Sequence, residues 1–260
     1  VSRISQKYYY INIVYNLMCV PLLESDFLLH LPDLYHEIAH PLISSDNEPK
    51  VENFRKNLGE FNNYSIQYFE RKISSDIRNN NSKFKRYYEY WQNAWVKAWS
   101  TELFCDLFAT FVLGPAFGWA NLHLCVKTGN DCFYTQTVGN TTHPADHTRM
   151  LAIMHALDLI NFENEKIKIN EYWNYFIDKS NNKKEPLFDM AYPSELIEQC
   201  SVFALKATKS VGCKIVTKDT KGEIINLLTN AWKQYLFNPS QYVQWEKKVV
   251  NSLIDSFKVK

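Results

Sequence analysis

The sequence predicts a mainly α-helical protein, and three observations favour this fold class. Hydrophobic residues recur at steps of three and four over long stretches, which is the spacing of one face of a helix. Only 7 of the 260 residues are glycine, and the alternating runs typical of strands are few. The periodic stretches end at short clusters of asparagine, glycine or proline. With 46% hydrophobic residues, the chain can bury one substantial core or two smaller ones.

One short strand and two helices are predicted before residue 79. Tyr8 to Val14 is the strand candidate. The first helix opens at Pro32, after the apolar segment 27–29, because proline suits the first turn of a helix. The second helix covers Val51 to Ile77. Its apolar face consists of Val51, Phe54, Leu58 and Phe61.

A third and longer helix is predicted from Phe84 to Leu113. The cluster 79–82 caps it, and Gly114-Pro115 stops or bends it. Its inward face contains Phe84, Tyr88, Trp91, Trp95, Trp99, Glu102, Asp106, Ala109 and Leu113. Two carboxylates are therefore expected on the same face as three tryptophans.

The rest of the chain is also predicted to be mostly helical. One helix runs from Pro144 to about Ile160 and a short one from Asn170 to Asp178. Residues 179–193 contain two prolines and are predicted to form a linker or exposed loop. A short strand is expected at Lys214 to Thr217. Three amphipathic helices are predicted at about 193–209, 221–237 and 239–257.

This order of elements predicts two parts joined by a linker. We expect one domain over residues 1–178, the linker or loop over 179–193, and a C-terminal helical subdomain over 194–260 that packs on the first. The chain begins at Val1 rather than methionine. We therefore expect a fragment or processed form of a longer protein, whose missing upstream region carries targeting or regulation.

Residues His36-Glu37-Ile38-Ala39-His40 form an HExxH sequence. Histidines four apart on a helix project from one face, so both imidazoles can bind the same zinc ion. The glutamate between them can accept a proton from a water molecule that the ion polarises. The motif predicts a site for one Zn²⁺ per chain; the alternative is a helix with two incidental histidines.

Glu102 is the best candidate for the third protein ligand that a catalytic zinc requires. Burying an unpaired carboxylate costs several kcal/mol, so an acid on an inward helix face needs a partner. A dication held by the HExxH histidines would be one. Asp106, one turn further on, can then accept a hydrogen bond from the free N–H of a ligand imidazole. The alternative is an ordinary salt bridge from these acids to Lys97 or Arg149.

An HExxH sequence followed by a helix with ExxxD resembles the gluzincin metallopeptidases, the group that includes thermolysin. In that group the second glutamate is the third zinc ligand and the aspartate binds the first histidine. The resemblance implies these roles for Glu102 and for Asp106 acting on His36. It also implies a zincin-like arrangement of the two helices and a protein or peptide substrate.

The segment His143-Pro144-Ala145-Asp146-His147-Thr148-Arg149 resembles the His-Pro…Arg segment of the CAAX-prenyl-protease and heat-shock membrane branch. There the histidine donates to the tetrahedral intermediate and the arginine supports the site, which implies these roles for His143 and Arg149. Two alternatives stay open: His143 as a mere helix cap before Pro144, and His147 as the donor. The run Glu…Asp…Phe-Ala…Leu-Gly-Pro is also similar to metallopeptidases that act on phage repressors. Together these motifs cover roughly residues 31–155.

Two features depart from the family pattern. The membrane branch surrounds its site with transmembrane helices, but the longest apolar run here, Leu107 to Ala120, is too short to span a bilayer. Pro41 directly follows the second histidine, where those families usually continue the helix. It cannot donate to the carbonyl of Glu37 and disfavours helical geometry at His40, so we expect the helix to end or kink there.

Charge, cysteine content and targeting signals limit the remaining possibilities. A net charge of +1 gives no basis for nucleic-acid binding, and the basic clusters near 83–86 and 247–248 are expected on solvated helix faces. The six cysteines lack CxxC spacing, so we expect free thiols and no Cys-type structural zinc site. No secretory signal is recognisable, and we expect a cytoplasmic protein.

These patterns predict a zinc-dependent endopeptidase in which Glu37 is the general base. Two other classes stay open. One is a non-catalytic metal-binding regulator, against which the presence of Glu37 argues. The other is a signalling or repressor-interacting module with a peptidase-like domain, in which the missing upstream region provides recognition. No feature of the sequence marks the pocket that would select a substrate side chain.

Overall fold

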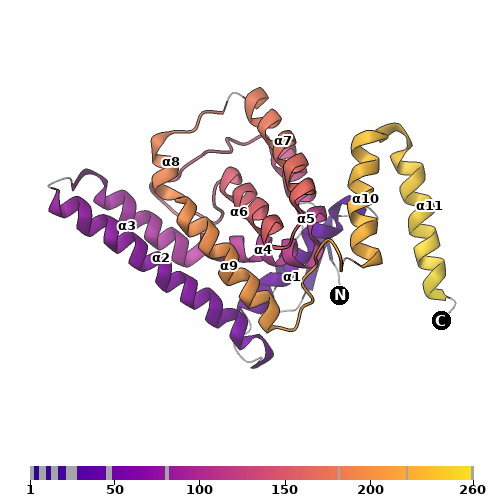
Figure 1. Cartoon of the computed structure of the whole chain (residues 1–260), viewed down its shortest axis with the longest axis horizontal. Coiled ribbons are helices and arrows are strands. Elements are labelled where there is room, and N and C mark those ends of the chain that lie inside the picture. Colours follow the sequence, from indigo (N-terminus) through magenta and orange to yellow (C-terminus); the bar gives the residue numbers. More distant parts are fainter. Residues whose placement is uncertain are drawn as a thin grey trace.

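The structure, a computed structural model, describes residues 3–5, 10–12, 17–21, 28–44, 49–79, 82–180, 182–220 and 222–258. Most of these residues are helical, which confirms the predicted mainly α-helical class (Figure 1). The helices are α1 (Leu31–Ser44), α2 (Glu52–Arg78), α3 (Lys85–Ala94), α4 (Ser100–Leu113), α5 (Pro115–Thr128), α6 (Asp146–Leu159), α7 (Glu163–Ser180), α8 (Pro186–Ala191), α9 (Ser194–Ser210), α10 (Glu223–Phe237) and α11 (Pro239–Lys258). The 3-10 segments are η2 (Leu28–His30), η3 (Pro49–Val51) and η4 (Ser82–Phe84), and η5 (Trp95–Trp99) is a π-helix.

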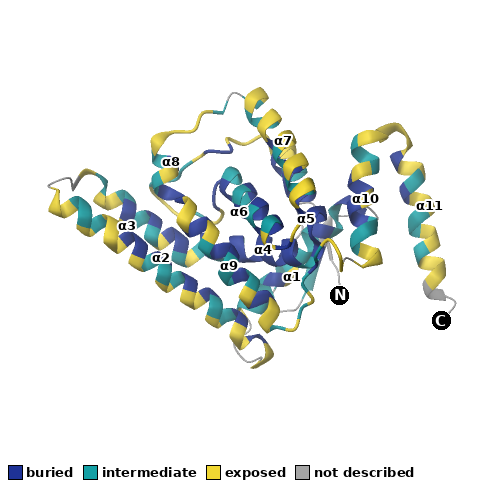
Figure 2. Ribbon diagram, in the orientation of Figure 1, coloured by how far each residue is buried: buried dark blue, intermediate teal, exposed yellow. Residues whose placement is uncertain are grey.

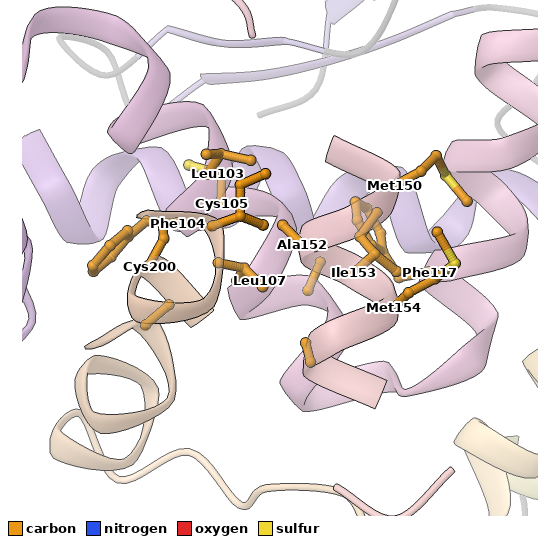
Figure 3. Packing of buried hydrophobic residues seen from close by; sticks show 14 of the residues in the cluster. Leu103, Phe104, Cys105, Leu107, Phe117, Met150, Ala152, Ile153, Met154 and Cys200 are labelled. Carbon is orange, nitrogen blue, oxygen red and sulfur yellow. The ribbon is translucent and has the colours of Figure 1, made fainter. Parts of the chain in front are cut away.

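Helix α4 lies at the centre of the fold. It packs against α1, α5, α6 and α9, and every residue from Leu103 to Phe111 is buried (Figure 2). A helix that is apolar around most of its circumference has to be enclosed by other elements. Figure 3 shows side chains that meet in this core, among them Leu103 and Phe104 of α4, Phe117 of α5, Ile153 of α6 and Cys200 of α9.

The long helix predicted from Phe84 to Leu113 is continuous but not uniform, because the π-helix η5 separates α3 from α4. The side chains of Trp91, Trp95 and Trp99 are all fully buried, as the inward face predicts. Side chains spaced four apart drift gradually around an α-helix, because one α turn holds fewer than four residues. A π turn holds more residues than an α turn, so it turns the following side chains back toward the same face. The hydroxyl of Ser100 donates to the carbonyl of Trp95 at 2.5 Å, at the junction of η5 and α4.

A small sheet lies beside α1. Its strands β1 (Arg3–Ser5), β2 (Tyr10–Asn12) and β3 (Leu17–Pro21) have the order β1-β3-β2, with β1 parallel and β2 antiparallel to β3. Strand β2 falls within the strand predicted at Tyr8 to Val14; the remainder of that segment is outside the described residues. The strand predicted at Lys214 to Thr217 is wrong. There the N–H of Val216 donates to the carbonyl of Phe111 at 2.9 Å, one of the last carbonyls of α4, which have no partner within the helix.

Of the two outcomes expected at Pro41, an end or a kink of the helix, the structure excludes the end, because α1 continues through Pro41 to Ser44. Proline removes a single hydrogen bond, the one to the carbonyl of Glu37. Leu42 and Ile43 pack against the core beyond it, so tertiary contacts compensate for the loss. The second histidine of the motif is therefore inside the helix and not at its end.

Two predicted boundaries in the second half of the chain also differ from the structure. The short helix expected from Asn170 to Asp178 is part of the longer α7. The predicted linker 179–193 contains α8, in which Phe188 and Ala191 are buried. Pro186 stands at the start of this helix, where proline is tolerated, so a residue that suggested a loop opens a helix instead.

The last three helices, α9, α10 and α11, do not pack together as one unit. Helix α9 packs against α2, α4 and α6 and so contributes to the central core. Helices α10 and α11 form a hairpin at one end of the molecule (Figure 1), where α10 packs on α5 and η2. The buried carboxylate of Glu246 on α11 accepts hydrogen bonds from the Leu28 N–H at 2.7 Å and the Tyr242 hydroxyl at 2.6 Å. Among the described residues, no helix has the length and apolarity that crossing a membrane requires.

Candidate metal centre

Helices α1 and α4 pack against each other and carry the predicted metal-binding residues. Helix α1 contributes His36 and His40, four residues apart. Helix α4 contributes Glu102, Cys105 and Asp106, whose spacing of three and four places them on one face. The site therefore forms where the central helix of the core meets the helix that carries HExxH.

His36 is held by both of its ring nitrogens. Nδ1 donates to Asp106 Oδ1 at 2.7 Å, and Nε2 lies 3.4 Å from Glu102 Oε2. Burial by itself lowers the pKa of His36, but the hydrogen bond and charge of Asp106, together with Glu102, raise it to about 10. Surroundings that favour a proton on this ring also favour a cation at its Nε2, because both are positive charges beside the same carboxylates.

Asp106 is fully buried and links His36 to Arg149 of α6. The Arg149 guanidinium donates from Nε to Oδ2 and from Nη2 to Oδ1, each at 2.7 Å. Burial of Asp106 opposes its ionisation, but the charge and hydrogen bonds of Arg149 hold its pKa below the usual range. The sequence left two roles open for Asp106, as a hydrogen-bond partner of an imidazole and as a salt-bridge partner. In the structure, Asp106 makes both contacts.

Glu102 has a carboxylate oxygen that is suited to a metal ion. Its Oε2 is buried without a well-formed hydrogen bond, although it lies 3.4 Å from His36 Nε2 and 3.2 Å from His143 Nε2. Two ligands of one tetrahedral zinc, with bonds of about 2.0–2.1 Å, lie roughly 3.4 Å apart. Burial opposes ionisation of Glu102, yet the neighbouring imidazoles hold its pKa well below the usual range. An ionised oxygen that lies close to imidazole nitrogens without a well-formed hydrogen bond fits a zinc ligand.

Cys105 contacts the other histidine, and sequence reasoning missed it. Its Sγ lies 3.6 Å from His40 Nδ1, and burial raises the pKa of the thiol well above its usual value. The ligand atoms of His36, His40 and Cys105 lie within 4.8 Å of one another. The only signal in the sequence was its position three residues after Glu102, which places the two side chains on one helix face.

Glu37 lines a cavity of about 680 Å³ together with His36, His40 and Glu102. The same cavity is bounded by Phe117 and by other residues of α5. Burial raises the pKa of the Glu37 carboxyl, and the charge of Glu102 acts in the same direction, whereas His36 lowers it. A raised carboxyl pKa at the wall of a cavity suits a group that accepts and returns a proton near neutral pH.

Of the two histidines proposed as donor, His143 faces the site. It lines the cavity, and its half-exposed ring reaches Glu102. His147 points elsewhere: its Nδ1 accepts a hydrogen bond from Trp173 Nε1 at 3.0 Å, and its ring packs on Phe133. Burial lowers the pKa of His147 to about 4, so this ring is neutral at physiological pH. The structure thus gives His147 a packing role.

Comparisons of the chain with protein-family models, with curated proteins and with solved structures find no match. The chemistry of the site is inferred below from its own residues.

Proposed function

We propose that this protein is a zinc-dependent endopeptidase of the gluzincin kind. The observation that carries the proposal is the pair of contacts at His36: its Nδ1 is fixed by Asp106, and its Nε2 lies 3.4 Å from a buried oxygen of Glu102 that makes no well-formed hydrogen bond. This is the contact pattern of a metal ligand with a carboxylate partner. The zincin-like part of the fold, α1 lying across α4 with β2 beside α1, belongs to the same proposal.

His36, His40 and Glu102 would hold the ion. Zinc in such a site supplies a Lewis acid and lowers the pKa of water toward neutrality. Asp106 fixes the His36 ring and is itself fixed by Arg149, so Arg149 acts through Asp106.

Glu37 would accept a proton from the attacking water and pass it to the leaving amine. Its raised pKa brings proton transfer closer to neutral pH. His143 Nε2, at the cavity wall, would donate a hydrogen bond to the carbonyl oxygen as that oxygen gains negative charge. The substrate is a protein or peptide segment bound along the cavity between α1 and α5.

Metal analysis and a cleavage assay test this proposal together. The purified protein should contain close to one zinc per chain, and His36→Ala or Glu102→Ala should lose most of it. Glu37→Gln should keep the zinc, while cleavage of a mixture of peptides, followed by mass spectrometry, falls by a factor on the order of 10² or more. Full zinc retention in His36→Ala, or unchanged cleavage by Glu37→Gln, would contradict the proposal.

Cys105 supports a second candidate, a metal-binding regulator without catalysis. Its Sγ lies within 4.8 Å of a ring nitrogen of each HExxH histidine, and thiolates are common ligands in structural zinc sites. Cobalt substitution separates the two functions. A cobalt–thiolate charge-transfer band that disappears in Cys105→Ser favours the regulator, and its absence favours Glu102 as the ligand.

A further inference from the structure

Residues 129–145 connect α5 to α6 without regular secondary structure, and they carry His143. The side chain of His143 is 56% exposed. An exposed side chain on such a segment keeps a defined position only if other groups hold it. The contacts of this segment therefore determine whether His143 Nε2 can remain near Glu102.

Indole N–H groups of α3 and η5 hold the segment at two points. Trp91 Nε1 donates to the carbonyl of Gln136 at 2.9 Å, and Trp99 Nε1 donates to the Thr141 hydroxyl at 2.9 Å. Trp95, between them, donates instead to the carbonyl of Ala191, also at 2.9 Å. The helix that leads directly into Glu102 thus also fixes the segment that bears His143.

The Thr141 hydroxyl relays the contact from Trp99 to His143. It accepts the indole N–H and donates its own proton to the carbonyl of His143 at 3.2 Å. A hydroxyl has one proton, and a donor on its oxygen orients that proton toward a different acceptor. The chain of bonds fixes the backbone at His143.

Thr142 fixes the ring of the same histidine. Its Oγ1 lies 2.8 Å from His143 Nδ1. His143 Nε2 lies beside the Glu102 carboxylate, which only accepts hydrogen bonds. If the ring carries its proton on Nε2, facing Glu102, the Thr142 hydroxyl is the donor to Nδ1.

We infer that Trp99, Thr141 and Thr142 are positioning residues that hold His143 as an Nε2–H donor facing the cavity. The inference rests on the proposed function for what His143 does, but the anchoring itself can be measured without any catalysis. Through these three residues, the helix that leads into Glu102 controls the position of His143 on the neighbouring loop.

Matched tryptophan variants test the anchoring. Trp99→Phe keeps a buried ring but removes the N–H, and Trp95→Phe makes the same change at an equally buried position whose partner is outside the segment. Amide hydrogen exchange at residues 140–143 should become about fivefold faster in Trp99→Phe, the effect of one lost hydrogen bond, and stay unchanged in Trp95→Phe. Equal exchange in Trp99→Phe and the parent overturns the inference, as does equal acceleration in both variants.

A double-mutant cycle tests whether Thr142 acts through His143. Thr142→Val removes the hydroxyl at nearly constant size and should lower turnover of a cleaved peptide by about fivefold to tenfold with KM unchanged. Thr142→Ser should restore turnover. In the His143→Ala background, Thr142→Val should have no further effect. An equal loss in both backgrounds overturns the inference.

The ring ¹⁵N shifts of His143 give the tautomer directly, and Thr142→Val should move them away from the Nε2–H pattern. A pattern with the proton on Nδ1 in the parent overturns the inference. When the parent contains zinc, failure of these tests leaves the proposed function intact. When the parent contains no zinc and cleaves no peptide, the proposed function fails, while exchange and ring shifts still decide the positioning.

Discussion

Asp106 accepts hydrogen bonds from both His36 and Arg149, and this double role determines what its removal would do. Asp106→Asn should lower zinc affinity by roughly 10- to 100-fold, the usual effect of losing a carboxylate partner of a ligand histidine. It should also destabilise the fold, because the Arg149 guanidinium loses its buried counter-charge, at a cost of about 3–5 kcal/mol.

Chelator competition and urea unfolding measure these two effects of Asp106→Asn. Asp146→Asn, at a half-buried acid of α6 that also lines the cavity, is the control. If zinc affinity falls while the free energy of unfolding is unchanged, another group must balance the buried charge of Arg149.

Cys105 gives a second prediction at the residue scale. Cys105→Ala removes the sulfur that lies 3.6 Å from His40 Nδ1, so zinc affinity should fall by about tenfold. Cys105→Ser, which retains a polar atom able to accept from the ring, should lose less. Equal affinities for the parent and the alanine variant, measured by the same competition, would mean that His40 is oriented by its helix alone.

The half-buried ring of His147 makes the stability of the fold depend on pH. Its pKa is lowered from 6.5 to about 4 in the folded protein, so between these values the unfolded chain binds more protons than the folded one. The contribution of the neutral His147 ring to the free energy of unfolding is fully present above pH 6.5. It is lost as the pH falls toward 4.

His147→Gln provides the matched control for this pH dependence. It can still accept from Trp173 but does not titrate, so its stability should fall less steeply than that of the parent over this interval. Parallel urea-unfolding curves for the two proteins across the same pH range would contradict the burial argument.

Single residues of the site were predictable where the sequence spacing defines a helix face. His36, Glu102 and Asp106 lie as close together in the structure as HExxH and the inward face of the third helix imply. Cys105 was not found, because its contact with His40 depends on how two helices cross. The same is true of His143, which lies near Glu102, and of His147, which packs against Trp173.

At the scale of elements, periodic hydrophobic patterns predicted most of the helices but not α5 or α8, and two prolines stand in helices where other outcomes were expected. Pro186 suggested a loop and opens α8, and Pro41 suggested an end or a kink and lies inside α1, which does not end there. In both places buried neighbours decide the outcome, and local sequence does not contain them. The strand expected at Lys214 to Thr217 failed for the related reason that its hydrogen-bond partner is a helix end.

Pro41 gives a prediction at this scale. Pro41→Ala restores an N–H that can donate to the carbonyl of Glu37 and removes the clash of the ring with it, so α1 should be more stable by about 1–3 kcal/mol. Urea unfolding measures the gain, with Pro239→Ala, at the start of α11, as a control that should give none. A destabilised Pro41→Ala would show that α1 is bent there and needs the proline.

At the scale of the whole molecule, a buried carboxylate of α11 joins the hairpin of α10 and α11 to η2, directly before α1. Glu246→Ala leaves the Leu28 N–H and the Tyr242 hydroxyl without their acceptor, which should cost about 1–3 kcal/mol each in the free energy of unfolding. Glu246→Gln keeps one acceptor oxygen and should lose less, and Lys247→Ala, exposed on the same helix, should be neutral. Equal stability of Glu246→Ala and the parent would mean that water replaces the carboxylate.

This long-range contact shows what sequence patterns cannot supply. The amphipathic faces of the last three helices predicted that they pack on something, but not that α9 joins the core beside α4 while α10 and α11 remain at one end. Glu246 and its partner Leu28 are 218 residues apart along the chain, and no periodic signal connects such distant positions.

The indole bonds of Trp91 and Trp99 have an optical consequence. Release of the segment 136–145 would bring water to these two rings and shift their fluorescence to longer wavelengths, whereas Trp95, bonded to Ala191, would keep its apolar emission. The protein therefore contains its own spectroscopic reporter of the loop beside the site. Loop movement can be followed in the unlabelled chain, on the timescale of a stopped-flow experiment, as a peptide or a metal ion binds.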